Sequence, residues 1–256
     1  MMSPTVSKSD SSPRRPKPHL KPKNVRRFVD ELFGDTMHAR RVDSLADAVS
    51  GVLHAASLAI HAIGRGLAAA RGIHPKHATK QIDRLLSNDG VSLWRLFALW
   101  VRFVVDDRKE IVVALDWTEF DSDKQATICL YLVTSHGRAT PLVWKSVEKG
   151  TLEGKRNSYE TEAIDRLGAA LPGDVKVTVL ADRGFGDQKR YDHLAFIGWD
   201  YVIRFREGIL VTDTSGCTKP AAEWLAKTGQ AKMLKDARVT DDKTVVPACP
   251  DPLGVT

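Results

Sequence analysis

The stretch "IVVALDWTEFD", residues 111–121, runs through five apolar residues and then reaches Asp116. A second stretch, "VLADRGFGD" at residues 179–187, also leaves an apolar run at an aspartate, Asp182. Short runs rich in β-branched residues predict strands buried on both faces, where an unpaired charge is costly. Because ligands of α/β sheets collect at the carboxyl ends of strands, we expect the two carboxylates to face one another from adjacent strands.

Two carboxylates without a histidine or cysteine between them favour a hard cation, Mg²⁺ or Mn²⁺. Paired ions about 3.5–4 Å apart can activate a water or a 3′-hydroxyl and stabilise the leaving oxygen of a phosphodiester. Asp116 and Asp182 are therefore our candidate catalytic residues and metal ligands. The alternative is that each aspartate only caps a strand end in solvent.

The residues next to these acids have two interpretations each. Arg183 would hold a phosphate or pair with a nearby acid. Asp187 fits the N-cap of a following helix. Glu119, Asp121 and Asp123 lie in a predicted hairpin turn, where we expect them to be solvated.

The sequence around the two stretches predicts an α/β fold with a mixed sheet and helices packed against it. The strand that carries Asp116 and the two strands after residue 121 are expected to be antiparallel neighbours, and helices then alternate with further strands. The expected elements are strands 111–117, 126–134, 140–147, 175–181 and 201–206, and helices 159–171 and 187–198.

The loop that leaves the third strand is rich in cations. Lys145, Lys149, Lys155 and Arg156 surround it and would grip the DNA backbone. A solvated loop is the alternative for each of them.

Residues 28–108 have helical periodicity. One helix is predicted from Asp43 or Ser44 to Gly72, and further helices over 74–88 and 91–107. The helix over 74–88 carries Lys76, Lys80 and Arg84 after a short turn, which suits a helix laid against DNA. An ordinary solvated helix face is the alternative.

The net charge of +6 is concentrated at the amino terminus. Residues 1–27 hold eight Lys or Arg residues against a single acid, Asp10, and are also rich in Ser and Pro. Such a segment cannot bury enough apolar area to order itself, but it can bind polyanions. We expect either a disordered basic tail that contacts DNA or a solubilising leader.

Cysteine usage and hydropathy indicate the compartment. The three cysteines are widely spaced, and Cys129 lies in an apolar run that predicts a buried thiol. No apolar stretch reaches the roughly 18 residues that cross a bilayer. We expect a soluble cytoplasmic protein without a membrane partner.

Several motifs together resemble the DDE transposases of bacterial insertion sequences, in particular the insertion-sequence-four family. "ALDWT" at 114–118 and "LADRGFGD" at 180–187 are followed by "WDYVIRFR" at 199–206. "KQIDRLLSN" at 80–88 and "KGTLEGKRNSYE" at 149–160 extend the match over about 76–210.

The resemblance implies a ribonuclease-H-like catalytic core over 109–208, preceded by a helical DNA-binding domain over 28–108. Asp116 and Asp182 match its first and second acids, which hold Mg²⁺ together with a glutamate. Such enzymes cut transposon ends in double-stranded DNA and join the 3′-hydroxyl to target DNA, so a nucleoid-associated protein is expected.

The family's glutamate lies in a helix marked Tyr-x2-Arg-x3-Glu-x6-Lys, which this sequence does not match. Tyr201 and Arg204 would place Gly208 at the glutamate and Ser215 at the lysine.

Two other glutamates, Glu207 and Glu223, lack the right helical context. We therefore expect residues 209–256 to be the start of a β-rich insertion, truncated before the third acid, with impaired activity.

Two main hypotheses follow, beside a third, a different ribonuclease-H-like nuclease. The first is an insertion-sequence transposase that performs Mg²⁺-dependent hydrolysis and strand transfer, acting as a homodimer on paired ends. The second is a non-catalytic transposase remnant that binds transposon ends.

Overall fold

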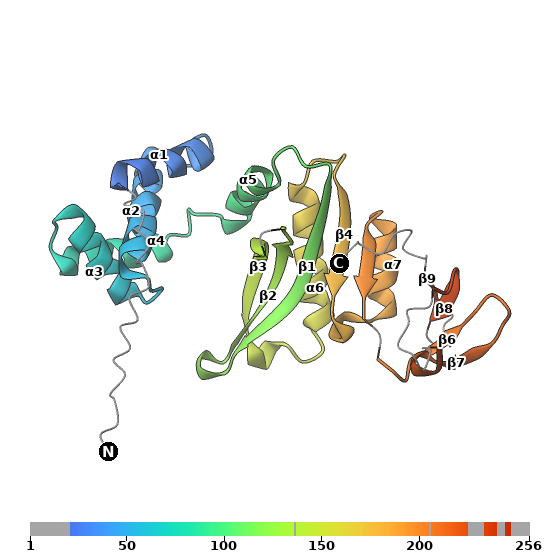
Figure 1. Ribbon diagram of the computed structural model, residues 1–256. Coiled ribbons are helices and arrows are strands. Elements are labelled where there is room, and N and C mark those ends of the chain that lie inside the picture. Colours follow the sequence, from blue (N-terminus) through green and yellow to red (C-terminus); the bar gives the residue numbers. More distant parts are fainter. Residues whose placement is uncertain (1–20, 136, 205, 225–232, 240–243, 247–256) are drawn as a thin grey trace, which may run out of the picture. The chain divides into compact units, whose positions relative to one another are not determined.

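The computed structural model describes residues 21–135, 137–204, 206–224, 233–239 and 244–246. The chain divides into two compact units, Met1–Val91 and Ser92–Thr256 (Figure 1). Residues 1–20 of the tail predicted over 1–27, and residues 225–232, 240–243 and 247–256 of the predicted insertion, lie outside the described residues.

The first unit contains four helices among its described residues, α1 (Pro22–Phe33), α2 (Ala39–Ala55), α3 (Ile60–Arg71) and α4 (Pro75–Leu86). The prediction of a disordered tail up to residue 27 is wrong for residues 22–27, which lie in α1. Val25 and Val29 are buried there in a cluster with Val42 and Ala46 of α2. This apolar contact stabilises a segment whose high charge favours disorder.

The single helix predicted up to Gly72 is in fact two helices, α2 and α3. The backbone of Ala56 has φ 49°, in the left-handed region, and the two helix axes are bent by 97° at the break. The N-cap of α2 is His38, whose ring accepts a hydrogen bond from the backbone N–H of Arg40. The predicted end at Gly72 is confirmed, with φ 66°.

Glycines let the helices of this unit cross at close range. A Cβ on Gly66 would lie 2.3 Å from the carbonyl oxygen of Gly51, and one on Gly64 would lie 2.2 Å from Thr79 Oγ1. Because α3 packs on both α2 and α4, the apolar periodicity continues through the break between α2 and α3. The spacing of apolar residues therefore does not reveal the break between α2 and α3.

Among the described residues, no single helix has the length and apolar content to cross a membrane. Taken together, the bent pair of α2 and α3 passes the same test of length and composition.

The second unit is built on a five-stranded sheet with the order β3-β2-β1-β4-β5. Its strands are β1 (Glu110–Phe120), β2 (Gln125–Leu132), β3 (Thr140–Glu148), β4 (Lys176–Ala181) and β5 (Asp200–Ile203). The predicted antiparallel pairing of the first three strands is confirmed. β1 pairs parallel with β4, and β4 with β5, so only β2 runs against the others.

Helix α5 (Leu93–Val105) belongs to this second unit, although the sequence places it in the helical domain over 28–108. Its buried residues Phe97, Val101 and Val105 share one core with the sheet. A strongly apolar helix has the same sequence pattern whether it packs on helices or on strands, so the sequence does not show to which unit it belongs.

Helices α6 (Arg156–Ala170) and α7 (Gln188–Phe196) pack against one face of the sheet, and Figure 1 shows α6 behind the strands. Along β1, Ile111, Val113 and Leu115 are buried beneath these helices, while the residues between them are less covered. Val177 and Val179 repeat this alternation in β4. The prediction of a mixed sheet with helices against it is confirmed.

A second, small sheet follows, with the order β7-β6-β8-β9. It comprises β6 (Leu210–Thr212), β7 (Thr218–Pro220), β8 (Ala237–Val239) and β9 (Thr244–Val246). β8 and β9, which pair antiparallel, lie in the segment 209–256 that is predicted to begin a β-rich insertion.

The glycine crossing can be tested with a matched pair of substitutions. Gly66→Ala places a methyl group against the backbone of α2 and is expected to destabilise the protein by about 1–3 kcal/mol through overpacking. Gly168→Ala in α6 meets only Trp199 at 3.6 Å and is expected to stabilise by up to about 1 kcal/mol through helix propensity. Urea unfolding followed by circular dichroism measures both, and a Gly66→Ala protein as stable as Gly168→Ala would contradict the close crossing.

Candidate functional site

Asp116 lies in β1, and Asp182 directly follows β4, the parallel neighbour of β1. The register of β1 and β4 ends at the pair Leu115 and Ala181, so the next residue on each segment is an aspartate. Asp182 has an extended backbone, with φ −79° and ψ 178°. Paired residues of parallel strands point to the same face, and neighbouring strands lie about 4.8 Å apart. Both side chains are therefore on the face opposite α6 and α7.

The prediction that both faces of the 111–117 strand are buried, which would make the charge of Asp116 costly, is wrong. The strand is buried on one face only, and both Asp116 and Asp182 are exposed. A bound cation is thus not needed to offset desolvation, and the case for a metal rests on the juxtaposition of the two carboxylates.

The chain after Asp182 forms a tight turn. Asp182 Oδ1 accepts a hydrogen bond from Gly184 N at 2.7 Å, and Phe185 anchors the turn in the core. Arg183 is exposed. Asp187 caps α7 by accepting from Lys189 N at 2.9 Å, which confirms the predicted N-cap.

Cys129 lies opposite Asp116 on β2 but is unsuited to bind a metal as a thiolate. Burial raises the pKa of the Cys129 thiol to about 11, and the negative charge of Asp116 adds to the shift. The thiol therefore stays protonated at neutral pH. The predicted buried thiol is confirmed, whereas Cys249 lies outside the described residues.

The donor set fits a hard cation with few protein ligands. Two carboxylate groups are enough for Mg²⁺ when water and phosphate oxygens fill the rest of its shell. Among the described residues there is no group of three or more His, Cys, Asp or Glu side chains that would hold a metal. The third-acid candidates lie elsewhere in the chain, Glu207 after β5 and Glu223 in the short helix Ala221–Trp224, and Tyr201 lies in β5 rather than in a helix.

A buried ion pair holds the segments that carry the two aspartates. Glu160 of α6 and Arg190 of α7 form an ion pair with side chains only 5% and 2% exposed. Glu160 Oε1 also accepts from Trp117 Nε1 at 2.8 Å, one residue after Asp116. Arg190 donates a second bond to Thr161 Oγ1 at 3.2 Å. The sequence does not predict this network, because glutamate and arginine side chains are exposed at most positions in proteins.

The second candidate site is on α4. Lys76, Lys80 and Arg84 recur every four residues and are exposed, so they form one stripe along the helix. Ala78 and Ile82 are buried in the core of the unit. The three-residue turn between α3 and α4 contains Gly72, as in helix-turn-helix motifs.

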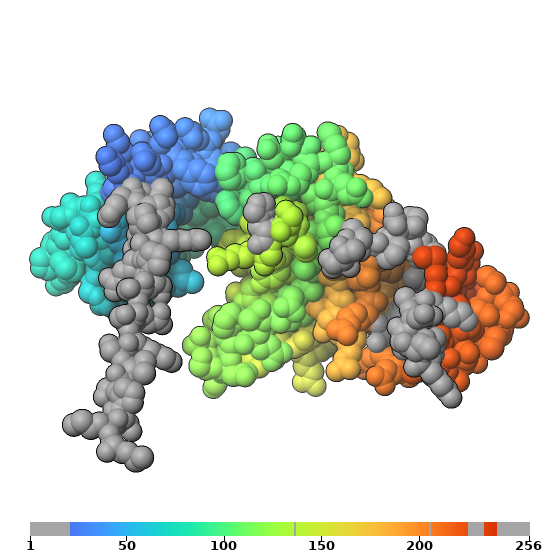
Figure 2. Space-filling view, in the orientation of Figure 1, coloured from blue at the N-terminus to red at the C-terminus, as the bar shows by residue number. Residues whose placement is uncertain are grey.

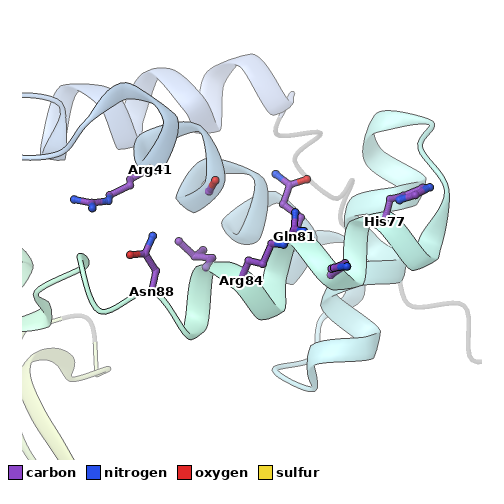
Figure 3. Close-up of a pocket in the computed structure, with 8 residues that line it drawn as sticks. Arg41, His77, Gln81, Arg84 and Asn88 are labelled. Carbon is purple, nitrogen blue, oxygen red and sulfur yellow. The ribbon is translucent and has the colours of Figure 1, made fainter.

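A hollow of about 520 Å³ lies beside this stripe. Figure 3 shows Arg41 reaching it from α2 and His77, Gln81, Arg84 and Asn88 reaching it from α4 and the turn that follows. Its lining residues include three cations and no acid: Arg41, Ser44, His77, Lys80, Gln81, Arg84, Leu85 and Asn88. The sequence predicted Lys80 and Arg84 here but missed Arg41, whose place depends on how α2 packs on α4.

Helix α4 is fixed to α2 by a shared carboxylate. Asp47 Oδ2 accepts from Gln81 Nε2 at 2.7 Å and from Arg71 Nη1 at 2.5 Å. Gln81 is thereby engaged within the protein, whereas Arg41, Lys80 and Arg84 line the same hollow as cations.

The predicted loop cations are mostly engaged with acids. Lys149 and Arg156 form ion pairs with Glu119 at 2.6 and 2.5 Å. Lys145 contacts Glu162 on α6 at 2.6 Å. Lys155, the N-cap residue of α6, is exposed.

Searches against protein-family models and curated protein sequences found no match to this chain.

The buried network predicts a large loss of stability when one partner is removed. Glu160→Gln leaves the charge of Arg190 buried without a carboxylate and is expected to cost about 3–5 kcal/mol. The double variant Glu160→Leu/Arg190→Met, which removes both charges, is expected to lose less than the single change. Chemical denaturation measures the three free energies, and a Glu160→Gln protein as stable as wild type would contradict the proposed role of the pair.

Proposed function

We propose that this chain is a DNA-binding protein of the DDE transposase type, in which α4 binds double-stranded DNA and Asp116 and Asp182 form a Mg²⁺ site for phosphodiester chemistry. The observation that supports the proposal is the parallel register of the central strands β1 and β4, which pairs Leu115 with Ala181, the residues directly before the two aspartates.

The strand order supports a ribonuclease-H-like core. The resemblance in the sequence requires the first and second acids to lie on neighbouring strands that are distant in the chain. Strands β1 and β4 meet this requirement, and they are separated by the β2–β3 meander and α6.

The first unit supports the DNA-binding part of the proposal. A helix after a short turn that presents Lys76, Lys80 and Arg84 in one row suits contact with a groove and its flanking phosphates. The acid-free hollow beside it adds Arg41 from a second helix. Two helices would thus contribute cations to one phosphate-binding surface.

The chemistry follows from the aspartates. Asp116 and Asp182 would hold the ion, which when bound activates a water or a 3′-hydroxyl and stabilises charge on a phosphodiester. Asp182 is oriented by its bond to Gly184 N, and Glu160 holds the β1 segment through Trp117.

A second candidate is a protein that binds DNA without catalysis. It is favoured by the lack, among the described residues, of a third acid grouped with the pair. Two carboxylates bind metal more weakly than three, and transfer at useful rates needs a well-held metal geometry.

DNA binding through α4 predicts a change in salt dependence. Lys80→Gln/Arg84→Gln is expected to weaken binding to duplex DNA and to lower the slope of log K against log salt by about 2, one for each lost phosphate contact. Lys109→Gln/Lys176→Gln removes the same charge from the second unit and serves as the control. Fluorescence anisotropy at several salt concentrations measures the slopes, and equal slopes for the two variants would exclude the α4 site.

The metal site predicts that Asp116→Asn and Asp182→Asn each abolish Mg²⁺-dependent nicking of DNA. Each is also expected to remove the rise in melting temperature that Mg²⁺ gives to the wild-type protein, because the ion binds only the folded pair. Asp165→Asn on α6 is the control. A metal-independent background equal in wild type and variants would exclude the catalytic site and leave the non-catalytic candidate.

A further inference from the structure

Four charged side chains form a cluster at the end of β1: Glu119, Asp121, Lys149 and Arg156. From the sequence, the two acids are predicted to be solvated in a turn and the two cations to bind DNA from a separate loop. Glu119 contacts both Lys149 and Arg156, and Asp121 in the turn contacts Lys149. The guanidinium of Arg156 also lies 5.3 Å from the centre of the Trp117 ring. The hydrogen bond from Lys149 is the main cause that lowers the pKa of Glu119, with Arg156 contributing.

The cluster is accessible to a large ligand. The hairpin that joins β1 and β2, drawn in green, projects at the surface of the second unit (Figure 2). Side-chain exposure is 30% for Lys149, 46% for Arg156, 41% for Glu119 and 86% for Asp121. Exposed ion pairs are weak, so another anion can replace the carboxylates without unfolding the hairpin.

The arrangement resembles an occupied phosphate site. Glu119 presents one oxygen to Lys149 and the other to Arg156, so a single anion bridges two cations from different elements. A phosphodiester has the same charge and also offers two unesterified oxygens to such a pair. Lys149 and Arg156 can therefore bind either the internal carboxylate or a phosphate of DNA.

We infer that Glu119, assisted by Asp121, is an internal competitor that masks a phosphate-binding site formed by Lys149 and Arg156. The inference rests on the proposed function for its natural ligand, the DNA backbone. DNA that reaches this surface displaces the carboxylates, and the free energy of the lost ion pairs reduces its affinity. The affinity for non-specific DNA is thereby lower than it would be if Lys149 and Arg156 were not paired with carboxylates.

Competition has a signature in salt dependence. Contact with a phosphate releases counterions from DNA, but a displaced carboxylate takes up a cation from solution. The slope of log K against log salt is thus less steep for the wild-type protein than for a variant in which no carboxylate is paired with Lys149 and Arg156. Removing Glu119 is expected to steepen the slope as well as to tighten binding.

The test compares Glu119→Gln with Glu148→Gln, which changes the charge by the same amount at the exposed residue beside Lys149. Glu119→Gln is expected to bind duplex DNA about two- to fivefold tighter, with a slope steeper by about 1. Asp121→Asn, at a more exposed position, is expected to give a smaller gain. Provided that the wild-type protein binds DNA, equal effects of Glu119→Gln and Glu148→Gln, or no gain from Glu119→Gln, would overturn the inference.

A double-mutant cycle identifies the site itself. In a Lys149→Gln/Arg156→Gln background, Glu119→Gln is expected to lose its effect, because no masked cations remain. A gain of the same size in that background would overturn the inference.

A heparin column separates this inference from the proposed function. Heparin carries sulfate groups of the same charge as the DNA backbone, so Glu119→Gln is expected to elute at higher salt than Glu148→Gln even if DNA is not the ligand. Co-elution of the two variants would overturn the inference. If neither the wild type nor the variants bind DNA but Glu119→Gln still elutes from heparin at higher salt, the result counts against the proposed function alone.

Discussion

The buried pair of Glu160 and Arg190 is the interaction on which the second unit depends. It connects α6 with α7, and through Trp117 it connects both helices with the strand that carries Asp116. Arg190 lies one turn after Asp187, in the helix that begins directly after the Asp182 turn. The two exposed aspartates are therefore positioned from beneath the sheet, by charges that solvent does not reach.

This arrangement separates stability from chemistry. The face beneath α6 and α7 holds the core and the buried ions, whereas the opposite face carries the aspartates. Along β1 the two roles alternate residue by residue, from Leu115 in the core to Asp116 at the surface and back to Trp117. A strand is well suited to this, since its successive side chains point to opposite faces. Changes to the acids can thus alter ligand binding while the core stays intact.

Local patterns in the sequence predicted the strands of the sheet and most helices, because β-branched runs and the Asp187 cap act over a few residues. They failed where packing between distant residues decides the outcome. The break at Ala56 depends on the crossing at Gly51 and Gly66, and the burial of Glu160 depends on Arg190, thirty positions away. For the candidate site, Asp116 and Asp182 were found from strand ends, whereas Arg41 and the engagement of Lys149 by Glu119 required the folded structure.

The parallel pairing of β1 with β4 also has a consequence for how the molecule assembles. It joins residue 111 to residue 177, whereas β1, β2 and β3 pair through short turns. Closing the longer loop costs more chain entropy, so the meander is expected to form early and the central parallel contact late. During synthesis the chain would carry Asp116 on a preformed hairpin long before Asp182 emerges, and any ligand that needs both acids would act only on a completed core.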